Sequence, residues 1–393
     1  MGGGMTDNAY RITEGNIEIF GYSTLLYKKE IIMKKTLAAV AVLGAFAGSA
    51  LAADVTLYGV MDLGFGFDRV DNGTTTTNDW AMKAGQDSGN RIGFKGSEQI
   101  SEDLTVGFQL ETQFSGDTGK NKDTFFHRES RLYVQTPYGE LGFGRMGALD
   151  STTGSYNLAG SGIHATTGVA GAGSTGIIFL GQNDRHNNTV TYKSPKFAGV
   201  TVYAQASTGI GGDDTDGNYG HDSDRYYGLG ATYDVGAFHS ALIVSSQDYK
   251  DVTHDAGVDD GLTVTAGASY DFGVTKAFVA GQYFDNVKAG AKVAEKTLAN
   301  GAEGYGLTVG AKTPVMGGVL TTQVGYSDAE SVADSNDEYG AYNVAVLYHY
   351  NLSKRTTVYG AVGYAETKWE NSVAATEDKI KTTSAGFGLI HKF

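Results

Sequence analysis

Residues 342–350 read YNVAVLYHY and alternate between two kinds of side chain. The even-numbered residues from Tyr342 to Tyr350 are Tyr or Val, whereas the odd-numbered residues between them include the polar Asn343 and His349. Because successive side chains of a β-strand point to opposite faces, a period of two predicts a strand with one apolar face and one more polar face.

The same alternation recurs along the chain. Residues 104–114 place mostly Leu, Val and Phe on one parity, and residues 200–207 alternate Val and Ala with Thr, Tyr, Gln and Ser. These segments run about ten residues, the length that a tilted strand needs to cross a bilayer. Tyr270 and Phe272 stand at a segment end, where the aromatic girdles of membrane barrels lie. A soluble β-sandwich also alternates and is the alternative fold.

The connections between these segments are of two kinds. Short turns recur, such as residues 136–139, 234–237 and 351–354. Outer-membrane barrels have short turns at one end and long loops at the other, whereas a sandwich has no reason to sort its loops in this way. The alternation therefore favours a membrane barrel, and the long, hydrophilic connections are expected at residues 208–224, 248–260, 285–303, 328–338 and 366–380.

The number of segments fits a closed barrel. We count about sixteen predicted strands, which allows roughly twenty-one residues for each strand and its connection. Barrels of this size hold a water channel, and closure removes the unpaired edges that a bilayer does not tolerate. The predicted fold is all-β: a transmembrane antiparallel β-barrel of about sixteen strands.

The composition agrees with strands that meet lipid on one face. The 393 residues include 57 Gly, 24 Tyr and 18 Phe but only 3 Pro and no Cys, and the mean hydropathy is -0.23. That value excludes a bundle of membrane helices, but it suits a barrel, in which only every second strand residue touches lipid. The absence of Cys fits an oxidising compartment.

Residues 33–52 read MKKTLAAVAVLGAFAGSALA and predict a signal peptide, cleaved between Ala52 and Ala53. The apolar run is too short for a membrane-spanning helix. Because such signals normally begin a chain, residues 1–32 are expected to be an upstream mis-called start, and residues 53–393 the barrel. Removal of residues 1–52, with five Lys or Arg and four Asp or Glu, leaves 25 basic and 40 acidic side chains and a net charge of -15.

The chain ends on an alternating strand, AGFGLIHKF, whose last residue is Phe393. A terminal Phe on such a strand resembles the recognition signal of the barrel assembly machinery. We therefore expect Phe393 to act as an assembly signal, and the assembly machinery to be a partner of the exported chain.

Five blocks of sequence have an informative order and spacing: residues 54–62, 91–98, 139–145, 188–195 and 350–356. Together they resemble the Gram-negative trimeric outer-membrane porins of the neisserial and betaproteobacterial type. The resemblance implies a sixteen-stranded homotrimeric barrel in outer-membrane lipid and lipopolysaccharide, with a third loop folded inward. It also implies a water-filled channel for passive diffusion of small hydrophilic solutes and ions, without a cofactor.

Residues 147–183 differ from the other long connections. They are rich in Gly, Ala, Ser and Thr and carry one charged side chain, Asp150. A segment of this composition can pack against a barrel wall and narrow the lumen, and the resemblance implies the same position. A surface loop is the alternative.

The resemblance implies constriction arginines at Arg91, Arg128 and Arg185. Alternation places Arg128 on the lipid face, with Leu132, unless a bulge turns it inward. Arg131 has the opposite parity and takes the lumen position if no bulge is present. Both arginines remain candidates.

Lys95 shares the parity of Arg91 and is expected to face the lumen, where Asp150 and Asp184 supply the acidic side chains. Rings of basic residues favour anions in a pore. We therefore expect a weak anion preference at low salt, because acids in external loops are screened beyond a Debye length of about 8 Å at physiological salt.

The sequence carries no pattern for an enzyme or a metal centre. None of the eight His lies in an H-E-x-x-H spacing, and no G-x-S-x-G motif occurs. The acidic balance argues against nucleic acid. Acidic loops such as residues 213–216 and 259–260 offer oxygen ligands for Ca²⁺, although such loops are more often only solvated. A surface-exposed adhesive barrel and a substrate-specific channel are the alternative functions.

Overall fold

A computed structural model describes residues 55–121, 124–160, 162–165, 173–210, 224–249, 259–288, 292–293, 296–298 and 301–393. Thr56–Phe393 form one compact unit. The predicted signal peptide, with its cleavage residues Ala52 and Ala53, lies outside the described residues. Among those described, no helix is long and apolar enough to cross a membrane.

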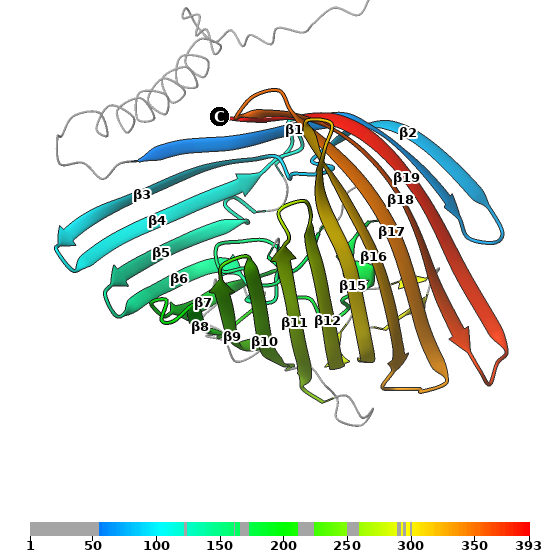
Figure 1. Ribbon diagram of the computed structural model, residues 1–393. Coiled ribbons are helices and arrows are strands. Elements are labelled where there is room, and N and C mark those ends of the chain that lie inside the picture. Colours follow the sequence, from blue (N-terminus) through cyan, green and yellow to red (C-terminus); the bar gives the residue numbers. More distant parts are fainter. Residues whose placement is uncertain are drawn as a thin grey trace, which may run out of the picture. The chain divides into compact units, whose positions relative to one another are not determined.

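Antiparallel strands make up most of the described chain (Figure 1). A short hairpin of β13 and β14 and one 3-10 helix, η1 (Thr175–Ile177), accompany them. The strands are β1 (Thr56–Asp71), β2 (Thr76–Ala84), β3 (Arg91–Ser101), β4 (Leu104–Gln113), β5 (Glu129–Thr136), β6 (Gly139–Gly147), β7 (Arg185–Lys193), β8 (Val200–Ser207), β9 (Arg225–Val235), β10 (Phe238–Asp248), β11 (Gly261–Asp271), β12 (Lys276–Val287), β13 (Lys292–Val293), β14 (Lys296–Thr297), β15 (Ala302–Val315), β16 (Gly318–Ser331), β17 (Asp337–Asn351), β18 (Thr356–Asn371) and β19 (Thr376–Lys392).

The sheet closes on itself between its first and last strands. One edge of β1 pairs with β19, and its other edge pairs with β2 and then with β3. Because β2 and β3 follow one another along the same edge, they count as one interrupted strand, and the barrel described has sixteen strands. Phe393 and Gly59 exchange backbone hydrogen bonds of 3.1 Å beside the β1–β19 ladder. The predicted closed, all-β antiparallel barrel is confirmed.

The interruption between β2 and β3 lies on the inner side of the wall. Residues 85–90 leave the ladder, and the backbone N–H groups of Asp87 and Ser88 each donate to the Asp62 carboxylate at 2.8 Å. Asp62 is fully buried and also accepts the Tyr359 hydroxyl at 2.8 Å. These bonds fix the segment against β1 and β18.

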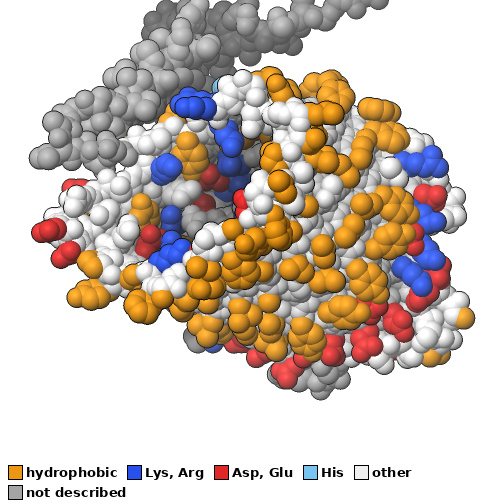
Figure 2. Space-filling model, in the orientation of Figure 1, with side chains coloured by type: hydrophobic (Ala, Val, Ile, Leu, Met, Phe, Trp, Pro, Cys, Tyr) orange, Lys and Arg blue, Asp and Glu red, His pale blue; other side chains and the backbone are white. Residues whose placement is uncertain are grey.

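The outer face of the barrel wall is apolar and its inner face is polar, which reverses the arrangement of a soluble protein. On β17, Tyr342 and Val344 are 45% and 43% exposed, whereas Asn343 and Leu347 are 3% and 4% exposed. Hydrophobic side chains cover the outer surface over the front strands (Figure 2). An apolar outer face and a polar inner face are what a barrel in lipid requires.

The two ends of the barrel differ in their connections, as the sequence predicts. Turns as short as residues 236–237 join the strands at one end, and the segment between β6 and β7 lies at the other. Two predicted long loops are much shorter, because β16 to β19 run for 14 to 17 residues. Polar residues expected in those loops instead pair across the strands, leaving only residues 332–336 and 372–375 as connections.

Candidate pore constriction

The described parts of the segment between β6 and β7 (residues 148–160, 162–165 and 173–184) contact the inner face of several strands. The backbone N–H of Leu149 donates to Gln205 on β8 at 3.0 Å, and that of Gly181 donates to Gln282 on β12 at 2.9 Å. Asn343 on β17 donates to the Ser174 carbonyl at 2.8 Å. The segment therefore makes contacts widely spaced around the barrel.

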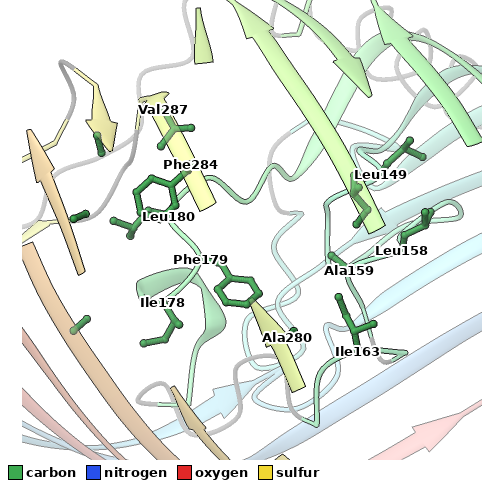
Figure 3. Close-up of a cluster of buried hydrophobic side chains, with 14 of the residues drawn as sticks. Leu149, Leu158, Ala159, Ile163, Ile178, Phe179, Leu180, Ala280, Phe284 and Val287 are labelled. Atoms are coloured by element: carbon green, nitrogen blue, oxygen red, sulfur yellow. The ribbon is translucent and has the colours of Figure 1, made fainter. Parts of the chain in front are cut away.

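Apolar packing reinforces these bonds (Figure 3). Ile178, Phe179 and Leu180 lie near Phe284 and Val287 of β12, and all five are at most 8% exposed. Full burial of such a side chain is worth about 1.5–3 kcal/mol. A second group packs at the other end of the segment and comprises Leu149, Leu158, Ala159 and Ile163.

Glycines of the wall permit this close approach. A Cβ added to Gly306 of β15 would lie 2.1 Å from the Ile178 carbonyl oxygen, and one added to Gly267 of β11 would lie 2.7 Å from the Ile163 side chain. Real Cβ atoms do not come so close to a backbone oxygen. Glycine at these positions lets the segment lie directly on the sheet.

Asp150 differs from the expectation that it faces the lumen. Its side chain is fully buried, and its carboxylate accepts hydrogen bonds from Ser245 at 2.7 Å, Asn183 at 2.9 Å and Tyr226 at 3.2 Å. Burial raises the pKa of this carboxyl above its ordinary value. Asp150 thus anchors the segment to β9 and β10, out of contact with water.

Three of the candidate arginines gather around one acidic side chain. Arg128 lies 2.5 Å from Glu111 on β4 and donates to Gln113 at 2.8 Å. Arg91 lies 3.7 Å from the other oxygen of Glu111. Arg185 pairs with Asp184 at 2.9 Å, and Arg128 interacts electrostatically with both Arg91 and Arg185. The group therefore joins β3, β4 and β7.

Arg128 and Arg131 both reach the inner side, by different routes. Arg128 precedes β5, which begins at Glu129, and the nearby Phe126 has a φ of 57°. Strict alternation therefore does not apply to Arg128, and no bulge in β5 is needed. Arg131 follows the alternation and lies 3.3 Å from Glu140 and 3.9 Å from Glu129.

The acidic partners of these arginines were not identified from the sequence. Glu129 accepts two hydrogen bonds from Ser155, and Glu140 accepts the Tyr156 hydroxyl at 2.5 Å. The inward parity of Glu111 was visible in the sequence, but its pairing with Arg91 of β3 and with Arg128, just before β5, was not. Because each arginine has a carboxylate nearby, this side of the lumen carries little net charge.

The remaining candidates lie at the edge of this group. Lys95 faces inward, and its Nζ lies 5.4 Å from the centre of the Tyr58 ring. The Tyr58 hydroxyl donates to Glu111 at 2.9 Å, which connects Lys95 to the arginine group. Asp184 has a side chain that is 77% exposed, in contrast to the buried Asp150.

The described residues contain no group of three or more His, Asp or Glu that could hold a metal ion. Residues 213–216, a candidate calcium loop, lie outside the described part of the chain. The face seen in Figure 2 is hollowed, and Lys and Arg side chains gather around the hollow.

Comparison with known proteins gives a consistent result. A family model described as Gram-negative porin matches residues 38–370. An outer membrane porin protein of Bordetella pertussis is 29% identical, covering 92% of this chain and all of the relative, and a major outer membrane protein P.IB of Neisseria meningitidis is 26% identical with the same coverage. An anion-selective porin from Comamonas acidovorans has the same fold, with a TM-score of 0.64 at 24% identity, covering 87% of this chain and all of that one.

Proposed function

Because the chain belongs to the family of Gram-negative porins and forms a passive channel in the outer membrane, we propose that this channel weakly prefers anions and is narrowed by residues 148–184. The observation that carries the proposal is the group of arginines on the inner wall beside that segment. Family and fold point to a channel rather than an enzyme.

The electrostatics support a weak preference rather than a strong one. Arg91 has a side chain that is 25% exposed, whereas the Glu111 side chain beside it is 9% exposed. At this pair a solute in the lumen meets more guanidinium than carboxylate, whereas at the Arg185–Asp184 pair the carboxylate is the exposed partner, which keeps the preference weak. Low-dielectric walls strengthen the field of such groups. The Comamonas acidovorans protein of the same fold is an anion-selective porin, which agrees with the proposed sign.

The narrowing follows from the anchoring of residues 148–184. Hydrogen bonds to β8, β12 and β17 and the apolar packing of its described residues hold the segment on the inner wall. A segment held at several points leaves a smaller opening beside the arginines. Solutes crossing the barrel would then pass close to Arg91 and Arg185.

Reversal potentials across planar bilayers with a KCl gradient test the proposal. We expect a chloride preference at low salt that declines as salt rises, because screening shortens the range of the charges. Arg91→Gln should move the reversal potential toward the cation value. Lys368→Gln, at a partly exposed position of β18 paired with Glu370, is the matched control and should leave it unchanged. Cation selectivity of the unmodified channel contradicts the proposal.

Assembly and location of the chain complete the proposal. We infer a homotrimer in lipid and lipopolysaccharide, export through the predicted signal peptide, and recognition of Phe393 by the assembly machinery. The contact of Phe393 with Gly59 supports a role at the closing seam. Gel mobility of unheated samples tests the trimer, and N-terminal sequencing tests cleavage before Ala53. A monomeric band or a different mature N-terminus contradicts the corresponding part.

A further inference from the structure

A second basic site lies on the inner wall, toward the end with short turns. A hollow of about 670 Å³ is bounded by β15 to β19, by the start of β3 and by His164 of the segment between β6 and β7. Its basic side chains are Arg91, Lys312 and Lys392. A volume of this size is typical of sites for small solutes.

Lys312 faces a second lysine across the sheet. Lys276 of β12 stands directly opposite Lys312 of β15. The Nζ atoms of Lys276 and Lys312 lie 5.2 and 5.3 Å from the centre of the Phe278 ring. Within the described residues, neither lysine has a carboxylate within 4 Å. Like charges placed opposite each other destabilise a sheet. An anion bound nearby would relieve this repulsion.

The acidic side chains near the hollow do not balance these charges. Asp87 is the acidic residue of the lining, and His349 already contacts it at 2.8 Å. Asp62 lies behind it, fully buried, with its carboxylate accepting N–H and O–H groups. Arg91 already has Glu111 nearby. Lys312 and Lys392 against Asp87 therefore leave an excess of positive charge in the lining.

His164 provides an independent sign of a missing partner. It lines the hollow and is 1% exposed; its Nδ1 lies 3.0 Å from the Thr308 hydroxyl, while its Nε2 has no partner among the described residues. Burial lowers the pKa of His164 to about 4, so the ring is neutral at neutral pH. If Nδ1 accepts from Thr308, Nε2 carries the proton and is a donor.

We propose that this hollow is a transient binding site for solutes that carry two negative charges on oxygen, such as a phosphate group or a pair of carboxylates. The inference deepens the proposed anion preference and rests on it, since Arg91 belongs both to the arginine group and to the hollow. Arg91, which pairs with Glu111, also lines the hollow, so an anion that passes from the arginine group toward the short-turn end would next meet Lys312 and Lys392. Their weak hold suits conduction, which requires release as well as binding.

Inorganic phosphate is the probe for this site. The full barrel is reconstituted in planar bilayers in roughly 0.1 M KCl, where the Debye length is about 10 Å. At about pH 8 phosphate is mainly dianionic. We expect phosphate to reduce the single-channel chloride current and to increase its noise. Lys312→Gln should raise the half-blocking phosphate concentration about tenfold, the effect of losing one charged partner.

Two further variants complete the design. Lys392→Gln should raise the half-blocking concentration in the same direction and serves if Lys312→Gln does not fold. Lys193→Gln is the matched control, because Lys193 lies near the short-turn end of β7 and is not part of the lining of the hollow. Its phosphate response should match that of the unmodified channel.

The outcomes separate this inference from the proposed function. An equal phosphate response in the unmodified channel, Lys312→Gln and Lys392→Gln overturns the site. A channel that prefers chloride but ignores phosphate also overturns the site while leaving the proposed function intact. Cation preference in KCl overturns the proposed function, whereas phosphate block that Lys312→Gln abolishes still supports the site.

Discussion

Two pairs of like-charged side chains face the lumen from different parts of the barrel, and only one pair has oppositely charged partners close by. Glu111 of β4 stands directly opposite Glu129 of β5, and arginines lie beside both glutamates. Lys276 of β12 stands directly opposite Lys312 of β15, and in the described residues neither has a carboxylate within 4 Å. Arginines of the protein offset the repulsion between the two glutamates, and we call this part of the barrel, β3 to β7, the arginine wall. No carboxylate offsets the repulsion between Lys276 and Lys312 in the same way, and we call β12 and β15 the lysine wall; there a bound solute could supply the negative charge.

The difference separates two roles that basic residues have in a pore. Paired arginines are held in fixed positions, because each has a carboxylate partner, and they contribute a modest field. The two lysines contribute a stronger field to the water beside them, since Asp87 interacts with Lys312 only at longer range and no carboxylate of the described residues lies within 4 Å of either lysine. The preference of the channel then depends on the lysine wall as well as on the arginine wall.

The largest effect is expected from removing the acid that the arginines share. Glu111→Gln leaves Arg91 and Arg128 without their common carboxylate, and breaking such a partly buried pair costs about 3 kcal/mol. The chloride preference should rise clearly, because two guanidinium charges lose their neutralising partner. Reversal potentials in a KCl gradient and the melting temperature of the barrel measure the two effects.

Glu303→Gln is the control for that substitution. Glu303 is exposed and accepts a hydrogen bond from Tyr283 at 3.2 Å. Its loss should change neither quantity appreciably. An unchanged reversal potential in Glu111→Gln would mean that the paired arginines do not control selectivity, and the contrast between the two walls would fail.

The next effect concerns Asp150, which fixes the segment beside the arginine wall. Asp150→Ala leaves Tyr226, Ser245 and Asn183 without their acceptor, which costs about 1–3 kcal/mol in the docking of the segment. We expect larger fluctuations of the open-channel current. Asp334→Asn, in the exposed connection of residues 332–336, is the control.

The pH dependence of these fluctuations has a definite sign. Because the pKa of the folded Asp150 carboxyl is raised above its ordinary value of 3.8, the docked segment is favoured below that value. This advantage is lost as pH rises through the raised pKa, so current fluctuations should grow with pH. Asp150→Asn, which cannot ionise, should remove the pH dependence. A dependence of the opposite sign would contradict the assignment of Asp150 as a buried anchor.

A comparable or smaller effect is expected from a substitution in β15 that pushes residues 148–184 away from the wall. Gly306→Ala places a Cβ 2.1 Å from the Ile178 carbonyl oxygen, so the segment must shift at a cost of about 1–3 kcal/mol. Single-channel conductance should fall, because the added Cβ pushes the segment away from the wall and into the lumen that it already narrows. Gly340→Ala on β17 meets nothing within 4 Å and should leave conductance unchanged. Equal conductance in both variants would place Ile178 outside the conducting path.

The sequence predicts the strands well because alternation is a local property of the backbone. Residues 342–350 place their side chains as expected, and Arg131 and Lys95 face inward by parity alone. Arg128 could not be oriented, because it lies just before β5, near a residue with positive φ. Alternation ends where the ladder ends, and the direction of such a side chain depends on the turn.

The burial of Asp150 and the opposition of Lys276 and Lys312 depend on long-range structure. A loop residue has no parity, so composition alone left Asp150 as a lumen acid. The register of β12 against β15 depends on how both strands align across the intervening connection, which a period of two does not specify. Both features govern the charge of the lumen, and both required the structure.

The smallest expected effect tests the lysine wall itself. Lys276→Gln removes one of two like charges that stand opposite each other, so it should stabilise the barrel by about 0.2–1 kcal/mol. Lys379→Gln is the contrasting control, because Lys379 lies 2.7 Å from Glu377 and its loss removes an exposed ion pair, with a slight destabilisation or none. Urea unfolding from detergent or lipid measures both. If Lys276→Gln destabilises the barrel instead, the lysine has a partner that offsets the repulsion, and the lysine wall would resemble the arginine wall after all.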